Sequence, residues 1–133
     1  MASGLSAWTS LHPHLLSALR IMTGLLFLQH GTTKLLSIPP TAMSGGTDPM
    51  TLITGTLELV GGALIVIGLF TRPVAFILSG FMAAAYFMAH APSSFYPIAN
   101  GGELAIMYCF AFLYLSAAGG GPWSADAIIR KKS

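Results

Sequence analysis

Ionisable side chains are scarce in this sequence, where Asp, Glu, Lys and Arg make up 8% of the residues. Four of them, His30, Glu58, His90 and Glu103, lie in or at the end of four different apolar segments. Lys34 stands four residues after His30 and therefore shares its face of a helix. These side chains suit proton transfer and hydrogen bonding to a ligand, and ionisable groups within apolar helices are functional-site candidates by default.

Glu58 interrupts the most apolar segment, residues 51–70 (TLITGTLELVGGALIVIGLF). It stands seven residues after Thr51, and His30 stands seven residues before Ser37. At 1.5 Å per helical residue, both side chains lie about 10 Å inside their segments. We therefore predict that Glu58 and His30 face each other and can form a proton relay.

The elements that position these residues follow from the composition. The chain has 133 residues, of which 54% are hydrophobic, whereas soluble domains have about 25% charged residues. This composition predicts a single integral membrane domain, residues 1–133. Segments of roughly 20 apolar residues cross a bilayer, and the apolar segments are residues 15–36, 51–70, 73–90 and 103–118.

Four crossings joined by short loops predict an all-α fold, an antiparallel bundle of four transmembrane helices with both termini on one side. Basic residues favour the cytoplasmic side. On the side of the termini lie Arg20, Arg72, Arg130, Lys131 and Lys132, against Lys34 on the other. We therefore expect a multi-pass protein of the bacterial cytoplasmic (inner) membrane, with both termini in the cytoplasm and the polar site in the outer half.

Further residues are expected to extend the polar site. Tyr86 stands four residues before His90, and Asn100 stands three residues before Glu103. Gly55, Gly61 and Gly62 surround Glu58 on its helical face, and such small residues let another helix or a flat ligand approach closely. The cofactor-binding candidates are His30, Lys34, Glu58, Tyr86, His90, Asn100 and Glu103.

Several functions are compatible with this set. The polar residues can form a structural network that fixes helix register, or a site for a quinone, with the histidines as donors and Phe27, Tyr86 and Phe87 as walls. A metal site is less favoured, because the Glu-x-x-His pairs of carboxylate-bridged bundles are absent, and we assign no metal ligands. The single cysteine excludes an internal disulfide, and the net charge of +2 is too small to suggest nucleic acid as a partner.

Several short motifs resemble those of the DoxX family of small four-span bacterial membrane proteins. They are residues 20–24 (RIMTG), 30–35 (HGTTKL), 58–62 (ELVGG), 68–72 (GLFTR), His90, residues 100–103 (NGGE) and residues 121–126 (GPWSAD). Their order and spacing span nearly the whole chain.

The resemblance implies a redox-associated membrane subunit, linked to quinone chemistry, in which a partner subunit carries the electron donor. It leaves open whether this chain is itself an oxidoreductase. The alternatives are a structural or assembly subunit without catalysis, or a binder of a metal or small molecule. Besides the lipid bilayer and this partner, a second copy of the chain is a candidate partner.

Overall fold

The computed structural model describes residues 2–132, with side chains for residues 4–130. Within this part of the chain every regular element is helical, which confirms the all-α prediction. The elements are α1 (Ala2–Thr9), α2 (His12–Leu36), α3 (Pro49–Ile67), α4 (Thr71–Ala85), the π-helix η1 (Tyr86–His90), the 3₁₀ helix η2 (Ala91–Ser93), α5 (Pro97–Asn100), α6 (Glu103–Ala118) and α7 (Ala125–Lys132).

The predicted apolar segments correspond to α2, α3, α4 with η1, and α6. Three stretches are long and apolar enough to cross a membrane: Gly4–Leu36, Pro49–Ile67 and Thr71–Ser93. Helix α6 is equally apolar but has 16 residues. The additional α1 was not expected, since its sequence is short and polar in part.

Capping residues and glycines set the ends of α3. Asp48 accepts a hydrogen bond from the Thr51 amide at 3.1 Å, and Pro49 occupies the first turn, where no amide donor is required. At the other end Gly68 adopts a left-handed conformation (φ 72°), which a glycine takes without steric cost. The helix therefore stops at Ile67, three residues earlier than the hydrophobic pattern predicts.

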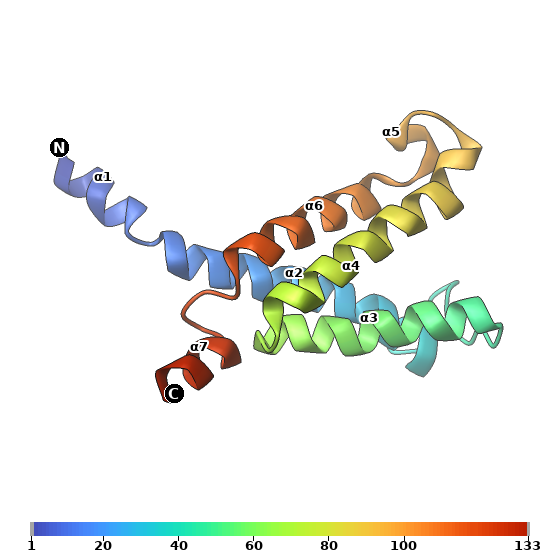
Figure 1. The fold of residues 1–133 in the computed structure, drawn as a ribbon. Helices are drawn as coiled ribbons and strands as arrows, with labels where there is room; N and C mark the ends of the chain where they lie inside the picture. Colours follow the sequence, from blue (N-terminus) through green and yellow to red (C-terminus); the bar gives the residue numbers. More distant parts are fainter. Residues whose placement is uncertain (1, 133) are drawn as a thin grey trace.

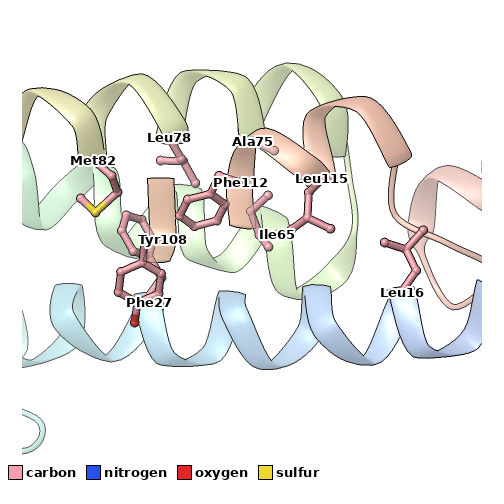
Figure 2. Packing of buried hydrophobic residues seen from close by; sticks show 9 residues of the cluster. All are labelled: Leu16, Phe27, Ile65, Ala75, Leu78, Met82, Tyr108, Phe112 and Leu115. Carbon is pink, nitrogen blue, oxygen red and sulfur yellow. The ribbon is translucent and has the colours of Figure 1, made fainter. Parts of the chain in front are cut away.

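The helices associate as two pairs, α2 with α3 and α4 with α6. Figure 1 shows the pairs close together near α7 and diverging toward α5. Between them lies a core of aromatic and aliphatic side chains, in which the ring of Phe27 meets those of Phe112 and Tyr108 edge-on at 5.0 and 5.2 Å (Figure 2). Ile65 and Leu115 continue this core toward the end where the pairs converge.

Close approach of α2 to α3 depends on glycine. A Cβ atom on Gly31 would lie 2.5 Å from the backbone nitrogen of Leu59, and one on Gly62 would lie 2.8 Å from Cα of Leu28. Gly55 packs against the side chain of Leu35 in the same way. Gly61 instead packs against the side chain of Leu78 in α4. The small-residue face around Glu58 is therefore covered by α2 and α4, so of the two predicted occupants the structure favours a helix over a flat ligand.

At the converging end, the segment between α6 and α7 is held by a buried arginine. Arg20 is 1% exposed and donates hydrogen bonds to the carbonyls of Gly120, of Trp123 (2.7 Å) and of Val66 (3.2 Å). Ser17 donates to the Gly120 carbonyl at 3.0 Å and accepts from the Trp123 amide at 3.1 Å. One cation and one hydroxyl thus satisfy the carbonyls that the glycine-rich turn leaves free.

Asp126 of α7 caps the N-terminal end of α4. Its carboxylate accepts hydrogen bonds from the backbone amides of Phe70 (2.8 Å) and Thr71 (2.9 Å). Neither Arg20 nor Arg72, which both lie at this end, forms a salt bridge with it within the described residues. The carboxylate instead caps a helix N-terminus, where amide donors and the helix dipole favour a negative charge.

Candidate functional site

The divergence of the two helix pairs leaves a pocket of about 770 Å³ at the end opposite α7. Most of its wall is apolar, with the exposed side chains of Met50, Ile53, Met88 and Leu104 near its surface. The polar side chains in the wall are His30 and Lys34 of α2, Thr51, Thr54 and Glu58 of α3, His90 of η1 and Tyr108 of α6. This combination of an apolar wall and few polar groups is typical of small-molecule sites.

A buried ion pair joins α2 and α3 in this wall. The Lys34 ammonium lies 3.0 Å from Oε1 and 3.2 Å from Oε2 of Glu58, and it also donates to Oγ1 of Thr54 at 3.3 Å. Side-chain exposure is 18% for Lys34 and 8% for Glu58. Only the contact with Oε2 has hydrogen-bond geometry, and Oε1 has no aligned donor within the described residues. The pairing removes most, but not all, of the cost of placing this carboxylate in an apolar wall.

His30 and Tyr108 complete the polar part of the wall on either side of Glu58. Their rings meet edge-on with centroids 6.1 Å apart, and both lie within electrostatic range of the Glu58 carboxylate. No described group forms a hydrogen bond with the His30 ring or the Tyr108 hydroxyl. Both side chains are therefore free to bind a ligand in the pocket.

Tyr108 is not among the site residues predicted from the sequence, which selected Glu103 on the same helix. The two residues are about 140° apart around the helix, so only one of them can face the pocket, and the structure places Tyr108 there. The helical register of α6 could have indicated that Tyr108 faces the pocket. Leu104, Ala105 and Tyr108 share one face by i, i+3 and i+4 spacing.

Tyr86, His90 and Asn100 form a polar cluster beyond the C-terminal end of α4. Nδ1 of His90 donates to the Asn100 carbonyl at 3.0 Å, because a carbonyl can only accept. The Asn100 amide nitrogen donates to the Tyr86 hydroxyl and to the Ser94 carbonyl, both at 3.0 Å. Within this cluster His90 lines the pocket, whereas Tyr86 and Asn100 lie behind it and fix its ring.

The π-helix η1 carries two of these residues. A π-turn inserts one extra residue into a helix and so rotates the residues that follow, and such turns are frequent at functional sites. In this chain the turn covers Tyr86–His90, and its C-cap amide of Ala91 donates to the Tyr86 carbonyl. The rotation determines where His90 points relative to the rest of α4.

Glu103 is separate from the other predicted site residues. It is exposed at the first turn of α6 and has no hydrogen bond or ion pair with any described group. A carboxylate at this position interacts favourably with the helix dipole. Among the described residues no group of three or more His, Cys, Asp or Glu side chains is close enough to hold a metal ion. His30, Glu58, His90 and Glu103 thus do not form a common ligand set.

An all-helical chain with three helices long and apolar enough to cross a membrane, arranged around an apolar pocket, defines a small helical membrane protein. The DoxX family model matches residues 15–91. The chain belongs to the DoxX family.

A comparison with curated proteins finds a relative that matches over almost the whole chain. A protein of Haemophilus influenzae, described as uncharacterized, is 46% identical over 127 residues, which cover 90% of this chain and 94% of the relative. No solved structure matches the chain significantly.

Proposed function

We propose that the chain is a single four-span domain of the bacterial inner membrane, with both termini in the cytoplasm. Helix α6 is the fourth crossing in this proposal. It packs along α4, and its 16 residues extend about 24 Å, which is close to the thickness of the hydrocarbon core. Arg20, Arg72 and Arg130 lie at the end near α7, and the bias of basic residues toward the cytoplasm supports this orientation. The pocket then lies in the outer half of the bilayer.

The pocket, in this proposal, binds a quinone-type ligand, and the chain is a redox-associated subunit. The observation that carries the proposal is an apolar pocket of about 770 Å³ with a buried acid–base pair in its wall. Phe27 and Phe81, which meet edge-on at 6.2 Å, give the pocket an aromatic wall against which a ring can pack. The exposed apolar residues at the mouth suit entry of a lipophilic molecule from the bilayer.

The residues of the pocket have distinct roles in this proposal. A bound quinone takes up two electrons and two protons, and the electrons come from a partner subunit. His30 and Tyr108 orient the ring by hydrogen bonds, since both side chains lack other partners. Glu58 passes protons toward the ring, and Lys34 holds its carboxylate in position at 3.0 Å. His90, fixed by Asn100, bounds the far side.

A structural or assembly subunit is the second candidate, and one observation favours it. Lys34, Glu58 and Thr54 already bind one another, and together they tie α2 to α3 without any ligand. In this case the pocket receives lipid or a helix of a partner protein, and the chain contributes no chemistry.

Gentle purification from a quinone-containing membrane tests the proposal, with the bound quinone quantified by mass spectrometry. We expect quinone in stoichiometric amounts with the wild-type chain and its loss with Glu58→Gln or His30→Ala. Glu103→Gln is the matched control and should retain it, because Glu103 lies outside the pocket wall. Quinone-free wild-type protein, with no binding on addition of quinone, would favour the structural subunit instead.

A further inference from the structure

Helix α7 lies at the converging end of the helix pairs, outside the apolar stretches that are long enough to cross a membrane (Figure 1). Ser124, just before the helix, and Ala127 are buried against the rest of the chain. The opposite face carries Ile128 and Ile129, which are 57% and 55% exposed. Lipid explains the exposed apolar side chains of a spanning helix, but those of α7 need a separate explanation.

Phe70 adds an exposed ring beside α7. Its backbone lies in the left-handed region, with φ 51°, which bulky residues rarely adopt. Asp126 of α7 accepts the Phe70 amide at 2.8 Å and joins the two segments. The ring itself is 62% exposed and does not belong to the hydrophobic core. Since glycine takes this conformation without steric cost, the backbone does not account for a phenylalanine, and the ring indicates an apolar contact outside the chain.

Trp123 adds a second exposed ring, two residues before α7. The indole is 57% exposed, and the His14 ring meets it edge-on at 5.1 Å. Arg20 donates to its carbonyl at 2.7 Å, and Ser17 accepts from its amide at 3.1 Å, so the residue is fixed in place. Indole rings are enriched at the boundary between hydrocarbon and water. Trp123 therefore indicates that this boundary lies close to α7.

Basic residues accompany this apolar set, and acidic residues are nearly absent from it. Arg130 is exposed on α7, and Lys131 and Lys132 follow it in the same helix. Of the four acidic residues of the chain only Asp126 lies at this end, and two backbone amides bind its carboxylate. Apolar residues next to basic ones are the pattern of helices that lie in a membrane interface and attract anionic lipids.

We propose that α7, with Phe70 and Trp123, forms an interfacial anchor that binds anionic phospholipid headgroups in the leaflet at this end, the cytoplasmic leaflet in the orientation proposed above. The isoleucines and the two rings enter the boundary between headgroups and acyl chains, and the basic residues 130–132 bind the phosphates. A second copy of the chain in the same orientation would cover the apolar side chains, but it would bring like charges to this end. The anchor does not depend on a ligand in the pocket.

Quenching of Trp123 by brominated lipids tests the anchor in the full chain, reconstituted in lipid nanodiscs. A Trp8→Phe background leaves Trp123 as the only indole. The probes are phosphatidylglycerol and phosphatidylcholine, each brominated near the headgroup end of its acyl chains and diluted into an unbrominated mixture of the two. We expect both lipids to quench Trp123, and we expect phosphatidylglycerol to bind beside it at least about fivefold more tightly, because several basic residues act on the same headgroup region.

Charge variants assign the lipid preference to α7. Arg130→Gln combined with Lys131→Gln and Lys132→Gln should lower the preference to about twofold or less. Arg72→Gln is the matched control and should leave it at the wild-type ratio, because Arg72 is exposed at the same end but donates to the Ala117 carbonyl.

Apolar variants test the insertion itself. Ile128→Ser combined with Ile129→Ser should about halve the quenching of Trp123 by either lipid, and so should Phe70→Gly. These side chains are exposed, so the variants should retain the fold.

Three results would overturn the inference. They are equal binding of the two lipids by the wild-type chain, a Trp123 that neither lipid quenches, and quenching that disappears when each disc holds two chains, which would show that a second copy covers α7. None of these results bears on the retention of quinone, so the proposed function is tested separately.

Discussion

The polar groups at the two ends of the helical domain differ in what they bind. Near α7, Arg20 is 1% exposed and donates to three backbone carbonyls, and Asp126 accepts two backbone amides. At the pocket end, Glu58 is also buried and is paired with Lys34, whereas the His30 ring and the Tyr108 hydroxyl form no hydrogen bond within the described residues. The groups near α7 hold the chain together, and His30 and Tyr108 remain available to a ligand.

The difference follows from how the helix pairs meet. They converge where the glycine-rich turn after α6 exposes carbonyls to Arg20, and they diverge where the loops are long (Figure 1). Substitutions near α7 should therefore change the free energy of unfolding, and substitutions at the pocket should change ligand binding more than stability.

Arg20→Ala should have the largest effect on stability. The substitution leaves the Gly120, Trp123 and Val66 carbonyls without their donor in a buried site, so we expect a loss of about 3 kcal/mol in the free energy of unfolding. Thermal unfolding in a mild detergent measures it.

Arg72→Ala is the matched control for Arg20. Arg72 lies at the same end and donates to the Ala117 carbonyl, but it is exposed, so its loss should cost less than about 1 kcal/mol. Equal losses for the two variants would show that burial of Arg20 does not distinguish this end of the molecule.

Lys34→Met should destabilise the chain by a smaller amount, about 2 kcal/mol, because it leaves the Glu58 carboxylate buried without its cation. Glu58→Gln should cost less, since Lys34 is the more exposed partner and its flexible stem can reach water. The double variant should recover most of the loss caused by Lys34→Met. Additive losses, measured by the same unfolding assay, would contradict a direct interaction of the pair.

Asp126 should make the end near α7 sensitive to acid. Burial by itself raises the pKa of Asp126, but hydrogen bonds from Thr71 and Phe70, together with Arg130, outweigh it and hold the pKa below its ordinary value of 3.8. A lowered carboxyl pKa stabilises the fold at pH values above the ordinary value, and this stabilisation is lost as the pH falls through the folded-state pKa. Asp126→Asn should therefore cost about 1 kcal/mol at pH 6.

Melting temperatures measured over a series of pH values distinguish the contribution of Asp126 from the contributions of other carboxylates. Melting temperatures of the wild type and Asp126→Asn should differ at pH 6 and converge as the pH falls through the lowered folded-state pKa of Asp126, because the wild-type side chain then becomes protonated. Asp48 also has a lowered pKa, caused first by its hydrogen bond with the Thr51 side chain, but it is present in both proteins. A difference that persists unchanged at low pH would contradict the assignment.

Hydrophobic patterning was sufficient to predict the helices, because apolar runs and turn residues are local properties of the chain. The predicted residues 103–118 coincide with α6. Ser124 caps α7 by accepting from the Ala127 amide at 3.1 Å, as serine before a helix commonly does. The pattern did not predict the π-turn at Tyr86–His90 or the early end of α3, which depend on backbone hydrogen bonding and on Gly68.

The site was harder to predict, because helix orientation is set by packing. Counting residues placed His30 and Glu58 at a similar depth and His90 at the end of its segment, and all three line the pocket. Depth does not specify which way a side chain faces. The rotation of α6 brings Tyr108 into the wall and leaves Glu103 exposed, and the glycines beside Glu58 meet α2 and α4. These outcomes depend on contacts between segments far apart in the sequence.

Glu103→Gln should have the smallest effect of all, and it tests where the pocket ends. The carboxylate is exposed and has no partner among the described groups, so only its interaction with the α6 dipole is lost, less than about 0.5 kcal/mol. Binding of a ring ligand, measured by calorimetry, should remain at the wild-type level, while Tyr108→Phe on the opposite side of the same helix should weaken it several-fold. Loss of binding with Glu103→Gln and normal binding with Tyr108→Phe would mean that α6 is rotated in the working protein, and that the available polar groups at this end are a different set.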